Sequence, residues 1–146
     1  MKKILVVDDS ALMRRVLCDI IEQDKRFQVV EKATNGLEAL ELLKKNTYDA
    51  VVLDVNMPKM SGLELLKELQ KNKIAARVVM ASTDTKEGAK TTLDALELGA
   101  LDFVHKPTSA LECRRDLFKN RLIQILAAVT ESRAPSFTKS FSIDDA

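Results

Sequence analysis

The sequence predicts an α/β domain in which five parallel strands form one sheet with helices on both of its faces, a doubly wound arrangement. Three observations lead to this fold class. Short apolar runs alternate five times with stretches of helical periodicity. The first run, residues 3–7, is apolar after its lysine, which is typical of a strand buried on both faces. The chain has 146 residues, of which 46% are hydrophobic, enough for one core.

The first βα unit begins with the apolar run at residues 3–7, which ends at Asp8 and Asp9. Ser10 then suits a helix N-cap because its hydroxyl can accept a bond from the first helical turn. The following helix is expected from apolar residues at helical spacing: Leu12, Met13, Val16, Leu17, Ile20 and Ile21.

The second strand is expected at residues 27–33, with Asn35–Gly36 as the turn that follows it. A second helix carries leucines at positions 37, 40, 42 and 43. The third strand, at residues 50–53, is again ended by an acid, Asp54. Pro58 and Gly62 then bracket a loop.

A third helix is expected from leucines at positions 63, 65, 66 and 69, and a fourth strand at residues 77–81. The fourth helix is expected at residues 87–98, with Gly99 as its stop. The fifth strand follows at residues 100–105. A single fifth helix starts near Ser109 and carries one apolar stripe: Leu111, Phe118, Leu122, Ile125, Leu126 and Val129.

The helical pattern stops at Thr130. We therefore expect one domain over residues 1–129, followed by a Ser-rich linker or disordered tail over residues 130–146.

Composition excludes several classes of protein. The 23 basic and 22 acidic residues balance to a net charge of +1, which argues against a nucleic-acid-binding module. The longest apolar run, residues 125–129, is too short to span a membrane, and no signal-peptide core follows the N-terminus. A cytoplasmic protein is expected. Cys18 and Cys113 are then expected to be buried, reduced thiols.

Polar residues at the carboxyl ends of the strands are the candidate functional residues, because ligands bind at that edge of an open α/β sheet. These residues are Asp8, Asp9, Asp54, Ser82, Thr83 and Lys106. If the first and third strands are neighbours, the three carboxylates converge, and their repulsion calls for a proton or a cation. Oxygen ligands favour Mg²⁺, which together with the Lys106 ammonium would balance the three negative charges. A role for the acids as simple helix caps is the alternative.

Asp54 is the candidate nucleophile. A carboxylate with the ordinary pKa of about 3.9 is ionised at neutral pH and needs no general base. Phosphoryl transfer depends mainly on positioning and on charge neutralisation, which Mg²⁺, the Ser82 hydroxyl and Lys106 can supply. The product would be an acyl phosphate on Asp54.

Four sequence blocks, at residues 5–10, 53–62, 79–83 and 103–107, resemble the receiver domain of two-component response regulators. The resemblance covers residues 1–128. It implies a flavodoxin-like (CheY-like) fold with strand order 2-1-3-4-5 and five helices.

The resemblance also implies roles for the site residues. Asp54 would accept a phosphoryl group from a phosphohistidine of a partner histidine kinase. Mg²⁺ would be bound by the carboxylates of Asp9 and Asp54 and by the backbone carbonyl of Asn56, and Asp8 would bind it mainly through water.

The remaining roles concern the switch. Ser82 would bond the phosphoryl oxygen and Lys106 would stabilise the phosphoryl group. The bond between Lys106 and Pro107 would be cis, although the base rate for X–Pro bonds favours trans. Phe103 would be a switch aromatic that moves with Ser82, the alternative being a plain core phenylalanine.

A narrower resemblance concerns residues 83–89 and 93–104 and the long last helix with its Ser-containing linker. These are similar to the receiver of chemotaxis protein-glutamate methylesterases, so the chain would be the regulatory half of such an enzyme. Asn56-Met57 is more similar to the single-domain chemotaxis receiver. A stand-alone receiver, or the receiver of another response regulator, is therefore the alternative.

The chain itself is not expected to be an esterase. Ser-His-Asp chemistry needs a histidine base, and the only histidine, His105, is expected inside a buried strand. No G-x-S-x-G motif is present. Arg14, Arg15, Arg114 and Arg115 are expected to be solvated helix residues that can also contact partners.

Three other functions fit the sequence less well. A haloacid-dehalogenase-type phosphatase would need an acid two residues after its nucleophile, where this chain has Asn56. A flavodoxin-like carrier of FMN would need a phosphate cradle after the first strand, where Asp8 and Asp9 would repel phosphate. An interaction domain with a vestigial acidic cluster would bind Mg²⁺ without becoming phosphorylated.

Overall fold

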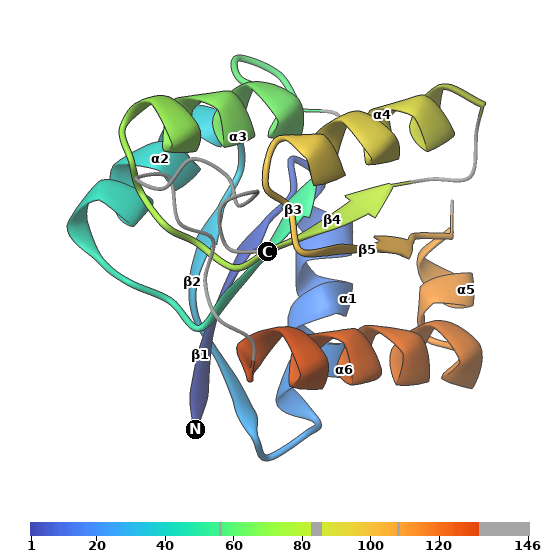
Figure 1. The fold of residues 1–146 in the computed structure, drawn as a ribbon. Helices are drawn as coiled ribbons and strands as arrows, with labels where there is room; N and C mark the ends of the chain where they lie inside the picture. The colour runs from blue at the N-terminus through green and yellow to red at the C-terminus, as the bar shows by residue number, and fades with distance from the viewer. Residues whose placement is uncertain (56, 83–85, 108, 132–146) are drawn as a thin grey trace, which may run out of the picture.

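The structure is a computed structural model that describes residues 1–55, 57–82, 86–107 and 109–131. Five parallel strands form one sheet in the order β2-β1-β3-β4-β5, which confirms the predicted fold class and strand order (Figure 1). The strands are β1 (Lys2–Val7), β2 (Phe27–Ala33), β3 (Ala50–Asp54), β4 (Val78–Ser82) and β5 (Asp102–His105). The helices are α1 (Ala11–Glu22), α2 (Gly36–Lys45), α3 (Gly62–Lys71), α4 (Lys86–Glu97), α5 (Ala110–Cys113) and α6 (Asp116–Thr130).

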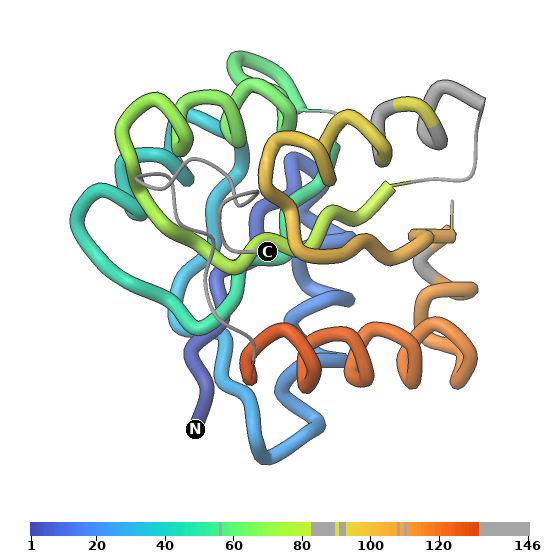
Figure 2. The backbone as a smooth tube through the Cα atoms, in the orientation of Figure 1, coloured from blue at the N-terminus to red at the C-terminus, as the bar shows by residue number. Residues whose placement is uncertain are grey.

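The sheet separates two apolar layers. Alternate residues of β1 enter different layers, because successive side chains of a strand point to opposite faces. Ile4 and Val6 pack with α1 and α6, whereas Leu5 and Val7 pack with α2, α3 and Ala95 of α4. Residues 4–7 are all 0% exposed, as expected for a strand covered on both faces. In the backbone trace, α1 and α6 lie on one side of the sheet and α2, α3 and α4 on the other (Figure 2).

Several helices, among them α1, α2 and α3, begin at a residue whose side chain accepts a backbone hydrogen bond from the first turn. Ser10 accepts from Met13 N at 3.2 Å, which confirms the predicted cap of α1. Asn35 caps α2 by accepting from Glu38 N, so Asn35–Gly36 is a helix start rather than the predicted turn. Ser61 and Glu64 form a reciprocal capping box at the start of α3.

The predicted single last helix is wrong, because the chain forms two helices, α5 and α6. Arg115 between them has an extended backbone (φ −79°, ψ 155°). In one continuous helix Cys113 and Phe118 would point about 140° apart. The break lets both side chains be buried, and it leaves Leu111, a member of the predicted stripe, 69% exposed.

The environment of the fifth strand also differs from the prediction. β5 lies at the edge of the sheet, and only Val104 within it is buried. His105 is exposed rather than buried, and Phe103 is 37% exposed. Gly99 has φ 110°, a conformation that favours glycine, and it ends α4 as predicted.

Both cysteines, Cys18 and Cys113, are buried and unpaired, as predicted. Burial raises the pKa of both thiols. Over the described part of the chain, no helix has the length and apolar character needed to cross a membrane.

Candidate functional site

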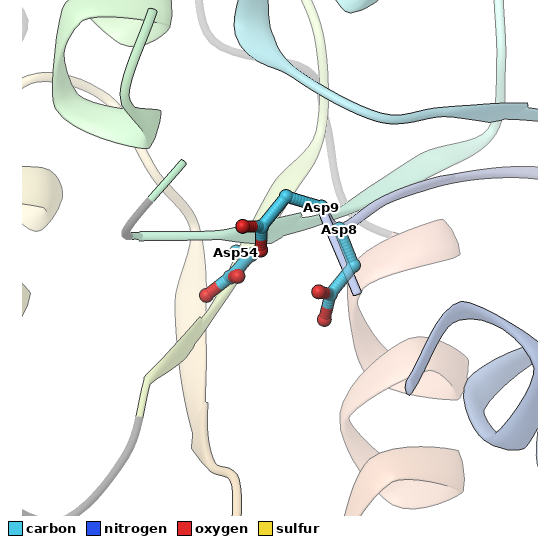
Figure 3. A group of neighbouring side chains, drawn as sticks. All are labelled: Asp8, Asp9 and Asp54. Atoms are coloured by element: carbon cyan, nitrogen blue, oxygen red, sulfur yellow. The ribbon is translucent and has the colours of Figure 1, made fainter. Parts of the chain in front are cut away.

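Three aspartates come together at the carboxyl edge of the sheet. Asp8 directly follows β1, Asp9 is the next residue, and Asp54 is the last residue of β3. β1 pairs with β3 so that Val7 lies opposite Leu53, which brings the residues after them side by side. One carboxylate oxygen from each aspartate lies within 4.8 Å of the other two (Figure 3). The sequence-based prediction that these acids converge is therefore confirmed.

Lys106 lies between two of the acids. Its Nζ is 3.0 Å from Asp8 Oδ2 and 3.3 Å from Asp54 Oδ1. All three side chains are nearly inaccessible to solvent, with 8%, 1% and 11% of the side-chain surface exposed for Lys106, Asp8 and Asp54. Buried charges in proteins are normally paired, and here the Lys106 ammonium pairs with the carboxylates of both Asp8 and Asp54.

The buried charges shift one another's protonation. Burial is the main reason that the pKa of Asp54 rises from 3.8 to about 6. The Lys106 ammonium opposes this rise, and the charges of Asp8 and Asp9 add to it. Burial also disfavours the charged form of Lys106, but Asp54 and Asp8 outweigh it and raise the Lys106 pKa.

These shifts revise the prediction for the nucleophile. The Asp54 pKa is above the ordinary value of a carboxyl group, chiefly because the side chain is buried and further because Asp8 and Asp9 are negatively charged neighbours. It still lies below neutral pH, so most Asp54 side chains are ionised there. Without another cation the cluster carries an excess of negative charge, with three carboxylates against one ammonium.

The donor set fits a magnesium ion. The three converging groups are carboxylates, the oxygen ligands that hard divalent cations prefer. Asp9 is exposed, so the cluster opens to solvent on that side, as a site that keeps several water ligands requires.

The loop after β1 is held by several contacts. The Asp8 amide donates to Ala33 O of β2 at 3.1 Å. Asp8 Oδ1 accepts from Ser10 N at 2.9 Å. The Asp8 carbonyl oxygen accepts from Arg14 Nη1 at 2.7 Å. The side chain and the main chain of Asp8 are both fixed as a result.

The prediction treated Arg14 as a solvated helix residue, and the structure instead makes it half-buried and bonded to the site. A signal in the sequence could have indicated this. A cation in the first turns of a helix is unfavourable next to the positive end of the helix dipole, which suggests another role for Arg14.

Ser82 and Lys106 come from the neighbouring strands. Ser82 is the last residue of β4, is 8% exposed, and follows Ala81, which pairs with Asp54. The Lys106 amide donates to Ser82 O at 2.7 Å, which ties the start of the β5–α5 loop to the end of β4. The sheet thus places Ser82 and Lys106 at the same edge as the acids.

Four predicted features fall elsewhere or cannot be placed. Asn56 and Thr83 lie outside the described residues. Phe103 is not a core residue, because it lines a hollow of about 530 Å³ together with His105, Pro107 and Phe118. No peptide bond among the described residues is cis, so the bond between Lys106 and Pro107 is trans, contrary to what the family resemblance implied.

The fold is similar to solved receiver domains. The response regulator domain of CheB from Thermotoga maritima superposes with a TM-score of 0.81 and is 37% identical, with 91% of this chain and 98% of that chain covered. The receiver domain of the Francisella response regulator 1452 gives a TM-score of 0.73 at 29% identity, covering 90% and 98% of the two chains.

Sequence comparison points in the same direction. A protein-glutamate methylesterase/protein-glutamine glutaminase of Treponema denticola is 40% identical over 96% of this chain, and one from Pyrococcus abyssi is 46% identical over 83%. The aligned parts are only 40% and 33% of those two proteins, so the chain spans well under half of their length. The family model for the response regulator receiver domain matches residues 4–117. The chain therefore belongs to the response regulator receiver domain family.

Proposed function

We propose that this chain is a phosphorylation-controlled receiver in which Asp54 accepts a phosphoryl group from a phosphohistidine of a partner histidine kinase. The observation that carries this proposal is the position of Asp54, at the end of β3, within 4.8 Å of the other two acids and 3.3 Å from Lys106 Nζ. Such a cluster supplies a nucleophile together with the charges that phosphoryl transfer requires.

The transfer needs little covalent machinery from the protein. A carboxylate oxygen of Asp54 forms a bond to phosphorus as the bond between phosphorus and the imidazole nitrogen breaks. The electron pair of the broken bond returns to the imidazole, which takes up a proton from water. Because Asp54 has a pKa of about 6, it is mostly ionised at neutral pH and needs no separate base.

The remaining residues would neutralise charge. We assign the Asp9 and Asp54 carboxylates and the Asn56 carbonyl as ligands of Mg²⁺, with Asp8 binding the ion mainly through water. When bound, Mg²⁺ supplies the positive charge that draws the phosphoryl oxygens toward the carboxylates. Lys106 would move its ammonium contact from Asp54 to the phosphoryl group, and the Ser82 hydroxyl would donate to a phosphoryl oxygen.

We further propose that the chain is the regulatory part of a chemotaxis protein-glutamate methylesterase. Two named methylesterases align with most of this chain over 40% or less of their own length, which supports a catalytic domain in cis. Residues 1–129 would be the receiver and residues 130–146 the linker toward that domain. The edge of the sheet at β5, which includes Phe103, would change conformation on phosphorylation.

Phosphorylation of the purified chain tests the core of the proposal. The chain is incubated with acetyl phosphate and Mg²⁺, and intact mass spectrometry counts the phosphoryl groups. We expect one phosphoryl group, removed by hydroxylamine as an acyl phosphate would be. None is expected in Asp54→Asn or in EDTA.

A matched control separates Asp54 from other aspartates. Asp24 is paired with Arg26 outside the acidic cluster. Asp24→Asn should be phosphorylated like the wild type. Equal incorporation in Asp54→Asn, or none in the wild type despite Mg²⁺ binding, would contradict the proposal and favour a vestigial acidic cluster.

A further inference from the structure

Arg14 contacts the peptide group that joins two of the clustered acids. It lies in α1, six residues after Asp8, and its half-buried side chain turns back toward the end of β1. Arg14 Nη1 donates to the Asp8 carbonyl oxygen at 2.7 Å, a short charge-assisted bond. That carbonyl belongs to the peptide plane whose other half is the amide of Asp9. Arg14 therefore restrains the rotation of the Asp8–Asp9 peptide.

The three acids are held in different ways. The Asp8 carboxylate bonds to Ser10 N and to Lys106, and the Asp54 carboxylate pairs with Lys106. The Asp9 carboxylate is exposed and makes no hydrogen bond or ion pair with any described residue. Its place in the cluster is therefore determined by its own backbone, which Arg14 holds.

We propose that Arg14 is a positioning residue, which acts through the Asp8–Asp9 peptide to direct the Asp9 carboxylate toward a divalent cation. This inference rests on the proposed function, because it assigns the acidic cluster to metal binding. Groups that orient metal ligands without touching the metal commonly change affinity by tenfold or more when they are removed.

Electrostatics alone predicts the opposite effect. Arg14 carries a positive charge near the acidic cluster, and a positive charge repels an incoming cation. If Arg14 acted only through this charge, its removal would make a divalent cation bind more tightly. If Arg14 acts by holding the peptide, its removal makes the cation bind more weakly. The sign of the change therefore distinguishes the two roles.

The test measures the dissociation constant of Mn²⁺, a paramagnetic substitute for Mg²⁺, by electron paramagnetic resonance on the unphosphorylated chain. We expect Arg14→Met to weaken Mn²⁺ binding by about tenfold. Arg14→Lys keeps the positive charge but has a shorter side chain with a single donor nitrogen. Its affinity for Mn²⁺ should therefore lie between those of Arg14→Met and the wild type.

Arg15→Met is the matched control. Arg15 is the next residue of the same helix, is exposed, and makes no hydrogen bond or ion pair within the described parts of the chain. Its replacement removes the same charge without touching the peptide, so Mn²⁺ should bind with unchanged or slightly higher affinity. Urea unfolding in EDTA, followed by circular dichroism, confirms that each variant is folded.

The outcomes separate this inference from the proposed function. If Asp9→Asn and Asp54→Asn weaken Mn²⁺ binding but Arg14→Met leaves it unchanged or tighter, the positioning role is wrong and the metal site stands. If Arg14→Met lowers the stability of the fold but not the affinity for Mn²⁺, the positioning role is also wrong. If the wild type binds no Mn²⁺, or the two aspartate variants bind it equally well, the metal site and the role of Arg14 both fail.

Discussion

Replacing Asp54 by asparagine should stabilise the metal-free protein at neutral pH, even though it removes the proposed phosphoacceptor. Burial, together with the charges of Asp8 and Asp9, makes the ionised form of Asp54 unfavourable in the folded chain despite the opposing charge of Lys106. Asparagine resembles the neutral carboxylic acid in shape and carries no charge. The substitution should therefore remove an electrostatic penalty.

The size of this effect follows from the change in pKa. Folding raises the pKa of Asp54 from 3.8 to about 6, and each pKa unit corresponds to 1.36 kcal/mol, which gives about 3 kcal/mol. Because the pKa is raised for an acid, the penalty is complete above the folded pKa. It disappears as the pH falls from about 6 to about 4, where Asp54 becomes protonated in both states.

Urea unfolding in EDTA, followed by far-ultraviolet circular dichroism, measures the effect. Asp54→Asn should raise the free energy of unfolding by about 3 kcal/mol at pH 7.5, and the gain should shrink toward zero near pH 4. Asp24→Asn is a control of opposite sign, because hydrogen bonds from Arg26 lower the Asp24 pKa. Its ionised form stabilises the fold above the unfolded pKa. Equal stability of Asp54→Asn and the wild type at pH 7.5, or a gain independent of pH, would refute the reasoning.

Three further substitutions can be tested by the same unfolding assay. Lys106→Met leaves the Asp8 and Asp54 carboxylates buried without their ammonium, so we expect a loss of about 3–5 kcal/mol at neutral pH; unchanged stability would argue against the buried pairing. Gly62→Ala places a Cβ 2.6 Å from the Asp54 carbonyl oxygen and should cost about 1–3 kcal/mol; a neutral result would show that α3 shifts freely. Ser61→Ala removes the α3 capping box and should cost about 1 kcal/mol, and a gain in stability would contradict that role.

The fold could be predicted because its signals are local. β1, β3 and β4 are short apolar runs that end at or next to a polar residue, and each long helix has a repeating apolar face. Strand β2 was predicted at its observed bounds, and the other strands within two residues at either end. The order of the strands is a long-range property, which the family resemblance supplied rather than the apolar pattern.

The errors occurred where neighbours outside the local segment decide the structure. The last helix was predicted as continuous because its apolar spacing is compatible with one helix. Packing against the sheet instead buries Cys113 and Phe118 on either side of a break at Arg115. His105 was expected in a buried strand, but β5 is at the edge of the sheet and leaves it exposed.

The sequence by itself determined which chemical groups stand at the strand ends: two acids after β1, one at the end of β3, a hydroxyl at the end of β4 and a lysine after β5. Only the tertiary structure decided how these groups act on one another. Lys106 and Asp8 are 98 positions apart in the chain, yet they meet at 3.0 Å. The raised pKa of Asp54 and the contact between Arg14 and the Asp8 carbonyl arise in the same way. Electrostatic energies depend on distance and burial, and only the folded chain defines these quantities.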